Sequence, residues 1–313
     1  MIKFTQHKKL DIDKFQNYIN IANSTNQFTN YGQAVRTLES RARTMLKIDS
    51  SKAIIATCNG AAALNTIMQT ICYAEQVYSQ DFTFPCNFQI PDIHTEAFDL
   101  TYDYEPDIHR ITRSGIVIIT NCFGHVTDIN SILRHAQYHD QKIVFDNAAS
   151  PYSFYNGSNI SNYGVASYIS LHHTKPIGFG EGGLVIIDIE YEQKARAIIN
   201  FGLLDKIPVY KGNNYKMSEL AAAGVLQWWD SFCIDELRNK YLKAYDKYVV
   251  TDSKVLPNYS ENFFPNCAPV IASDQNYKDM EVRKYYVPNR GLDNSVRLYN
   301  SINCVPITEF LND

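Results

Sequence analysis

The chain lacks several features that would assign it to a specialised class of protein. No apolar run approaches the ~20 residues that a membrane-spanning helix needs, so we expect no membrane association. The first residues, MIKFTQHKKLDIDKF, have no apolar core after their lysines and do not resemble a signal peptide. These two absences predict a cytoplasmic protein.

Cysteine patterns typical of metal or disulfide sites are also missing. The seven cysteines are odd in number and include no CxxC pair, so we expect reduced thiols and no metal site. The net charge of −4 provides no general attraction for nucleic acid. A phosphate group bound by this protein must therefore be held by local geometry rather than by a basic surface.

The composition is that of an ordinary globular protein, with 45% hydrophobic and 20% charged residues. Short apolar strands such as residues 115–120 and 142–145 alternate with helical segments, which predicts an α/β fold with a mostly parallel sheet. The length of 313 residues exceeds the usual size of a single core, and the pattern changes after about residue 235. We therefore predict a large domain at 1–235 and a smaller domain at 236–313.

A strand, a turn and a helix follow one another between residues 53 and 73. Asn59, Gly60 and Ala61 form the turn, at the carboxyl end of the strand, where ligands bind in open α/β sheets. A helix that begins there offers free backbone amides to a phosphate, and the hydroxyl of Ser170 is a further candidate ligand. The signal is weak by itself, because many strand-to-helix turns contain glycine.

Lys175 follows a predicted strand directly and precedes a glycine-rich turn. A lysine that is desolvated at a strand end can act as a nucleophile or form a Schiff base, although most lysines are solvated surface residues. Gly178, Gly180 and Gly183 also match G-x-G-x-x-G, the dinucleotide-binding fingerprint. That fingerprint needs a helix after it, and here the apolar strand LVIIDI follows, so the sequence does not predict a dinucleotide site.

Asp146 ends another apolar strand. A carboxylate in a largely apolar cleft is costly without a cationic partner, although an aspartate at this place can equally form a turn or cap a helix. A pyridinium nitrogen is one possible partner, and it is the one that enzymes dependent on pyridoxal 5'-phosphate (PLP) use.

Seven segments, in order along the chain, resemble the nucleotide-sugar aminotransferases of the DegT/DnrJ/EryC1/StrS family, which are PLP enzymes of fold type I. The strongest is SLHHTKPIGFGEGGLV (170–185), which resembles the family's S-F-H-x-T-K-x-x-x-x-G-E-G-G. The resemblance implies an aspartate-aminotransferase-like large domain and a shortened, small α+β domain at the C-terminus. The other six segments are NQFTNYG (26–32), NGAAAL (59–64), DFTFPCN (81–87), FGHVTDINSI (123–132), IVFDNAAS (143–150) and NNYKMSELAAAGVLQ (213–227).

The resemblance implies a role for each matching residue. Lys175 would form the Schiff base with PLP and later carry the α-proton, while Asp146 would keep the pyridine nitrogen protonated. Phe84 would stack on the cofactor ring. The phosphate would be bound by Gly60, Ala61, Ser170 and, from the neighbouring subunit, Asn214, which implies a homodimer with a shared active site. Residues near the sugar nucleotide would be Thr29, Asn30 and Lys216.

Three positions depart from the family pattern. Ala61 stands where the phosphate turn usually has threonine, Ala149 replaces the usual glutamine or histidine, and Lys216 replaces an arginine. The first two departures motivate one alternative, a cofactor-free structural or regulatory relative. Another alternative is a PLP-type sugar 3-dehydratase, in which histidine replaces the lysine, but Lys175 is intact beside His172.

The function implied by the resemblance is PLP-dependent transfer of an amino group from L-glutamate to a nucleotide-linked keto-deoxyhexose. The commonest substrates of the family are 4-keto-6-deoxyhexoses linked to dTDP, UDP or GDP, which give 4-amino-4,6-dideoxy sugars. A 3-keto sugar remains open, because nothing in the residues selects the carbon that receives the amine.

Overall fold

The computed structural model describes residues 1–5, 7–248, 256–260, 262–271 and 280–308. Its centre is a seven-stranded sheet with the strand order β1-β9-β8-β5-β4-β2-β3. Only β9 runs antiparallel to its neighbours, while the other paired strands of this sheet are parallel. The α/β fold with a mostly parallel sheet is therefore confirmed.

The sheet strands are short and almost fully buried. They are β1 (Lys52–Thr57), β2 (Val77–Gln80), β3 (Thr95–Phe98), β4 (Gly115–Thr120), β5 (Gln141–Asp146), β8 (Ala166–Ser170) and β9 (Gly183–Asp188). The helices are α1 (Ile12–Thr25), α2 (Gln33–Leu46), α3 (Gly60–Ile71), α4 (Ile129–Tyr138), α5 (Glu192–Ile198), α6 (Glu219–Trp229), α7 (Ile234–Tyr248) and α8 (Asp293–Ser301). Short 3₁₀ turns join several of them, including η1 (Pro85–Phe88) and η3 (Cys122–Gly124).

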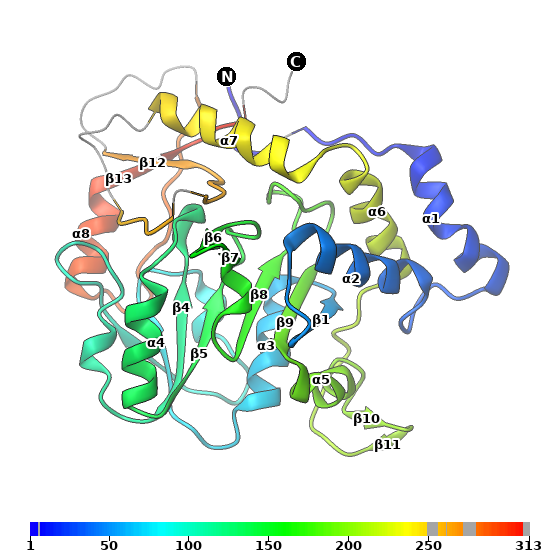
Figure 1. The fold of residues 1–313 in the computed structure, drawn as a ribbon, viewed down its shortest axis with the longest axis horizontal. Helices are drawn as coiled ribbons and strands as arrows, with labels where there is room; N and C mark the ends of the chain where they lie inside the picture. Colours follow the sequence, from blue (N-terminus) through cyan, green and yellow to red (C-terminus); the bar gives the residue numbers. More distant parts are fainter. Residues whose placement is uncertain (6, 249–255, 261, 272–279, 309–313) are drawn as a thin grey trace.

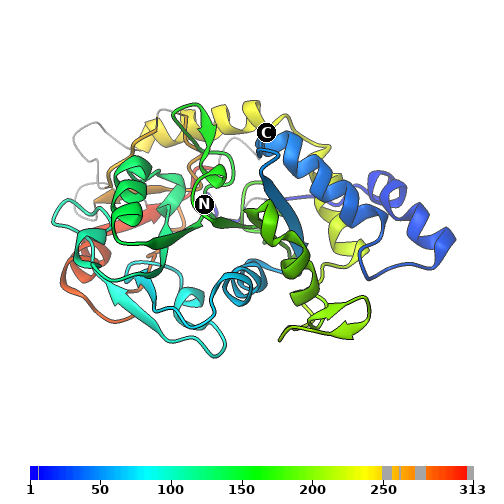
Figure 2. The ribbon, with the colours of Figure 1, turned by 60° about the horizontal axis from the view of Figure 1, so that its bottom comes forward.

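Helices cover both faces of the sheet (Figure 2). Along β4, Val117 and Ile119 join the core on the side of α2 and α4, whereas Ile116 and Ile118 join the core on the side of α3 and α5. This alternation follows from the two-residue period of a strand, and it explains why the strands read as continuous apolar runs. None of the helices in the described ranges is long and apolar enough to cross a membrane.

Side chains at the helix N-termini explain where several helices begin. Asn59, Asp128 and Ser218 each accept a hydrogen bond from an amide in the first turn of the helix that follows, at 2.8, 3.2 and 3.1 Å. Such caps satisfy amides that have no acceptor within the helix. The cap at Asn59 fixes the start of α3 at the carboxyl end of β1.

The C-terminal part contains a separate two-stranded antiparallel sheet of β12 (Ala268–Ile271) and β13 (Ile302–Val305). Helix α7 runs across the top of the molecule in Figure 1 and contacts β12. The N-terminus lies against this region, because Ile2 pairs with Met280 and the Thr308 hydroxyl donates to the Lys3 carbonyl. The boundary between two domains at residue 235 stays a prediction.

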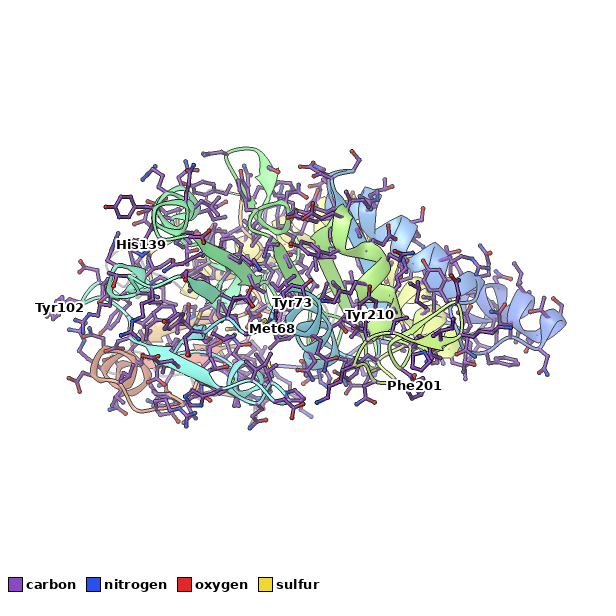
Figure 3. The ribbon with its side chains drawn as sticks, turned by 90° about the horizontal axis from the view of Figure 1, so that it is seen from below. Met68, Tyr73, Tyr102, His139, Phe201 and Tyr210 are labelled. Carbon is purple, nitrogen blue, oxygen red and sulfur yellow. The ribbon has the colours of Figure 1, made fainter. Side chains whose placement is uncertain are left out.

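The strands β10 (Leu203–Leu204) and β11 (Ile207–Pro208) form a hairpin on the opposite side of the molecule. Figure 3 shows Tyr73, just after α3, and Tyr210, just after the hairpin. The Lys194 ammonium of α5 lies 4.1 Å from the Tyr73 ring centroid and 5.6 Å from that of Tyr210. Cation–π contacts thus join the segment just after the hairpin to α5 and to the end of α3.

Candidate active site

The register of three neighbouring strands places polar side chains together at their carboxyl ends. Asp146, the last residue of β5, lies opposite Thr120 on β4 and opposite Tyr168 on β8. One carboxylate oxygen of Asp146 accepts from the Thr120 hydroxyl at 3.2 Å and from the Asn87 amide group at 3.4 Å. The other accepts from the backbone amide of Ala148 at 3.0 Å. These bonds orient the carboxylate at the strand tip.

A loop between β8 and β9 carries Lys175 to the same place. The amide of Lys175 donates to the carbonyl of His172 at 2.8 Å, and its carbonyl accepts from the amide of Gly178 at 3.0 Å. A Cβ at Gly178 would lie 2.2 Å from the His172 carbonyl oxygen, so only glycine permits this tight loop. The element that follows is the strand β9 and not a helix, as predicted from the apolar run LVIIDI.

The start of α3 and Ser170 form another part of the site. A Cβ at Gly60 would lie 3.2 Å from the Cβ of Ser170, so the turn and the end of β8 are in close contact. The amides of Gly60 and Ala61 precede the first intrahelical hydrogen bond, and the positive end of the helix dipole adds to their attraction for an anion. Together with the Ser170 hydroxyl, they could hold a phosphate.

These groups line a cavity of about 460 Å³. Phe84, whose side chain is 56% exposed, lies at this cavity, as do Asp146, Lys175 and Ala149. The volume is within the range of small-molecule and cofactor sites. An amine, a buried carboxylate, an aromatic ring and an anion-binding helix start thus face one space, which fits PLP.

Burial shifts the pKa values of the two central charged groups in opposite directions. It raises the pKa of the Asp146 carboxyl, although hydrogen bonds and Lys175 oppose the shift. It lowers the pKa of the Lys175 amine, although Asp146 opposes this shift. A cation beside Asp146 would therefore be stabilised, and a larger fraction of the Lys175 amine is neutral, and so able to act as a nucleophile, than for a solvated lysine at the same pH.

One wall of the cavity comes from segments that the sequence motifs did not indicate. Phe4 from the N-terminus and Arg283 and Tyr286 from the C-terminal part also line it. The Arg283 guanidinium lies 4.9 Å from the Phe4 ring centroid and is paired with Glu281 at 2.6 Å. Residues 283–288 resemble a landmark of the family's C-terminal domain, but nothing in that pattern assigns them to the cavity. The other lining residues from this part are Asn266, Cys267 and Tyr285.

Four predicted site residues lie outside this cavity in the single chain. Thr29, Asn30 and Asn214 are exposed, and none of them lines it. Lys216 instead donates to the Asn200 side chain at 2.8 Å. Their predicted roles toward the sugar nucleotide and, for Asn214, toward a neighbouring subunit stay predictions.

Two of the recognised segments meet through Glu219. Its carboxylate accepts from the amides of Ala34 and Val35, at 2.6 and 3.4 Å, and thereby caps α2 in place of a side chain at Gly32. The amide of Glu219 donates to the carbonyl of Phe28 at 3.0 Å. The segments 26–32 and 213–227 are therefore parts of one local structure, which the sequence resemblance did not show.

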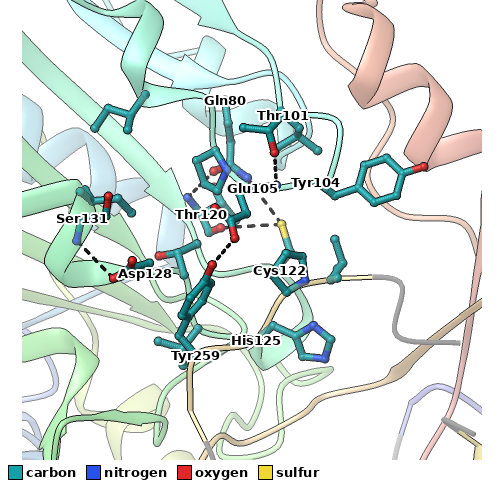
Figure 4. Close-up of a pocket in the computed structure, with 18 of the residues that line it drawn as sticks. Gln80, Thr101, Tyr104, Glu105, Thr120, Cys122, His125, Asp128, Ser131 and Tyr259 are labelled. Atoms are coloured by element: carbon teal, nitrogen blue, oxygen red, sulfur yellow. Dashed lines mark hydrogen bonds between the residues drawn. The ribbon is translucent and has the colours of Figure 1, made fainter. Parts of the chain in front are cut away.

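A smaller cavity of about 70 Å³ lies beside the first and shares Thr120 with it (Figure 4). The Tyr259 hydroxyl is hydrogen-bonded to Glu105 at its edge. This volume holds a few water molecules but no sugar or cofactor. In the described part of the chain, no cluster of three or more His, Cys, Asp or Glu side chains could hold a metal ion.

Known proteins resemble the chain in sequence and in fold. It is 26% identical, over 71% of its length, to the dTDP-4-amino-4,6-dideoxy-D-glucose transaminase of Shigella dysenteriae, and 29% identical, over 36%, to the dTDP-3-amino-3,4,6-trideoxy-alpha-D-glucose transaminase of Streptomyces venezuelae. These matches span 63% and 30% of the two relatives, less than two thirds of their lengths.

A solved structure shows the same fold over nearly the whole chain. It is that of a Bacillus cereus protein classed as a PLP-dependent aminotransferase, with a TM-score of 0.82 and 18% identity, covering 99% of this chain and 98% of that one. The fold type I architecture is thus confirmed. The family model of the DegT/DnrJ/EryC1/StrS aminotransferases matches residues 10–248, which is more than half of the chain. The chain therefore belongs to the DegT/DnrJ/EryC1/StrS aminotransferase family.

Proposed function

We propose that the protein is a PLP-dependent aminotransferase that acts on a nucleotide-linked keto-deoxyhexose, with L-glutamate as the amino donor. The observation that carries the proposal is the presence of Lys175 and Asp146 in one cavity with the start of α3. Family membership supports the same conclusion. When bound, PLP supplies the electron sink that allows the α-proton of the amino donor to leave.

Lys175 and Asp146 have different roles in this proposal. Lys175 holds the cofactor through Nζ and carries the proton, since burial lowers the pKa of its amine toward the working range of a general base. Asp146 holds a proton at the pyridine nitrogen, and its bonds to Thr120, Asn87 and Ala148 keep the carboxylate in place.

The remaining contacts bind and orient the cofactor. Gly60, Ala61 and Ser170 bind the phosphate at the positive end of α3, without the hydroxyl that a threonine at position 61 would add. Phe84 offers an exposed ring to the cofactor face. The retained lysine and aspartate support this function over a dehydratase or a cofactor-free relative.

The leading substrate is a 4-keto-6-deoxyhexose linked to dTDP, UDP or GDP, which would give a 4-amino-4,6-dideoxy sugar. The Shigella relative is a transaminase named for a dTDP-linked 4-amino sugar, which supports this choice. The Streptomyces relative is named for a 3-amino sugar, so a 3-keto substrate is the second candidate. Both names support dTDP as the nucleotide.

A homodimer with a shared active site is part of the proposal. Asn214 is exposed and lies outside its own cavity, as expected for a residue that serves a neighbouring subunit. Nearby apolar side chains, including Phe201, Ile207 and Val209, are more than half exposed, which fits a contact with a second copy.

Mixing the inactive variants Lys175→Ala and Asn214→Ala should restore activity if hybrid dimers contain one intact site.

The first test is the visible absorption spectrum with PLP, before and after L-glutamate is added. We expect a yellow band that glutamate bleaches, because the amino group passes to the cofactor. Turnover of 4-keto and 3-keto sugars linked to dTDP, UDP and GDP then identifies the substrate. A protein that stays colourless in excess PLP would contradict the proposal and favour the cofactor-free alternative. A band that glutamate leaves unchanged would favour the dehydratase.

A further inference from the structure

A buried lysine from the N-terminal segment holds the loop that carries Lys175. Lys8 precedes α1 in the chain, and the residue is only 8% exposed. Its ammonium donates to the carbonyl of His173 at 2.8 Å, to that of Lys175 at 2.6 Å, and to that of Gly178. An ammonium has three donors, so all of them are used on this loop.

Burial makes this arrangement costly for the chain. It lowers the pKa of Lys8 to about 7, while the three carbonyl oxygens favour the charged form because each accepts a hydrogen bond from the ammonium. An apolar side chain would avoid the desolvation but would leave three loop carbonyls without this donor. The free-energy cost of burying the Lys8 ammonium is therefore offset by hydrogen bonds that depend on this conformation of the loop.

Helix α6 holds the same loop from a second direction. The indole of Trp228 donates to the carbonyl of Pro176 at 3.1 Å, and that of Trp229 donates to the carbonyl of Ile177 at 2.7 Å. The Lys8 ammonium also lies 5.2 Å from the ring centroid of Trp228. Side chains from outside the loop thus bind five of the six carbonyls between residues 173 and 178.

We propose that Lys8 is a positioning residue, which fixes the backbone of the Lys175 loop so that the amine of Lys175 faces the cavity. Lys8 itself does not line that cavity, so it acts through the loop and not on the substrate. The inference rests on the proposed function of Lys175. Reactivity depends steeply on placement, because a displacement of ~1 Å can lower a rate by about a hundredfold.

The test compares Lys8→Met, which keeps the length of the side chain and removes its donors, with Lys9→Met, the exposed neighbour. One measurement is hydrogen–deuterium exchange of the loop amides, including those of Lys175 and Gly178. The other is the rate at which added PLP develops visible absorbance, with borohydride reduction and mass spectrometry to locate PLP on Lys175. In Lys8→Met we expect faster exchange of the loop and PLP capture slowed by about tenfold to a hundredfold. Lys9→Met should match the wild type in both.

Wild-type exchange and capture in Lys8→Met would overturn the inference. A lower unfolding temperature with wild-type capture by the folded variant would make Lys8 a general stabiliser, which also overturns it. If Lys8→Met does not fold, Lys8→Gln, which retains two donors, should give intermediate exchange and capture, and wild-type values would overturn the inference. A wild type that forms no reducible PLP adduct would contradict the proposed function, whereas the exchange measurement would still decide whether Lys8 holds the loop.

Discussion

The two walls of the cavity are built in different ways. One wall, which we call the sheet wall, consists of Asp146 and Ser170 at the ends of sheet strands, the start of α3, and Lys175 in the loop between β8 and β9. The other, the chain-end wall, consists of Phe4 and the lining residues between 266 and 286. Strand register positions Asp146 and Ser170, whereas hydrogen bonds between distant segments position the Lys175 loop and the chain-end wall.

Two carboxylates of the large sheet region hold residues 290–295, the segment that follows the chain-end wall along the chain. Asp81, just after β2, accepts from the backbone amides of Arg290 and Leu292 at 2.5 and 2.7 Å. Asp99, just after β3, accepts from the amides of Asn294 and Ser295 at the start of α8, both at 2.9 Å. The comparison teaches that Asp146 and Ser170 lie on the sheet itself, while the Lys175 loop and the facing surface depend on a few polar contacts with distant parts of the chain.

The largest effect should come from the sheet wall. Lys175→Ala removes the group that we propose holds the cofactor and carries the proton, so we expect turnover to fall by ~10⁴-fold. The circular dichroism spectrum and the oligomeric state should remain those of the wild type. Near wild-type transamination in this variant would show that the lysine is assigned wrongly.

Asp146→Ala should have the next largest effect. It removes the proposed partner of the pyridine nitrogen, and we expect weaker PLP binding and a rate lower by about 10²- to 10³-fold. Absorbance titration with PLP and steady-state kinetics measure the two effects. Asp146→Asn is the matched control for packing, because it keeps the shape but not the charge. Unchanged activity in both variants would contradict the proposed contact between Asp146 and the pyridine nitrogen.

The loop after β4 joins the two walls and should respond to acid. His125 there is hydrogen-bonded to Tyr245 of α7 at 2.7 Å, and burial lowers its pKa to about 4. Between pH 6.5 and 4 the unfolded chain binds a proton that the folded chain does not bind. The free energy of unfolding should therefore fall as the pH falls, by about 3 kcal/mol for this group.

Denaturant titrations at pH 7, 5 and 4 measure this loss. The variant His125→Gln cannot bind the proton, so its unfolding free energy should depend less on pH over the same interval. Equal pH dependence in the variant and the wild type would show that other groups cause the acid sensitivity.

The chain-end wall should give the smallest and most selective effect. Asp81→Ala removes two charge-assisted hydrogen bonds, and we expect a loss of about 2 kcal/mol in the free energy of unfolding. PLP binding should change little, because the sheet wall is intact, while the KM for the sugar substrate should rise. Denaturant titration and kinetics measure both. A loss of PLP binding equal to that in Asp146→Ala would contradict the separation of the two walls.

The sequence was informative where function depends on local order. Apolar runs indicated the strands, and Asn59 before a helical segment indicated the start of α3, because caps and strand patterns involve neighbouring residues. Lys175 follows a predicted strand and Asp146 ends one, and their segments resemble those of the family, which predicts their roles. The resemblance then related them to each other before any contact was known.

Tertiary structure decided which distant segments complete the site. Lys8, Glu219 and Asp81 act on backbone amides and carbonyls, and such partners have no side-chain pattern that a sequence displays. Likewise, the contact between Phe4 and Arg283 joins two segments that are far apart in the chain. The sequence by itself determined the fold class, because it depends on periodicity, and its resemblance to a family predicts Lys175 and Asp146 as the reactive pair, because they lie in local motifs. The chain-end wall and the hydrogen bonds that fix the Lys175 loop depend on contacts between residues far apart in the chain. Only the folded structure shows these contacts.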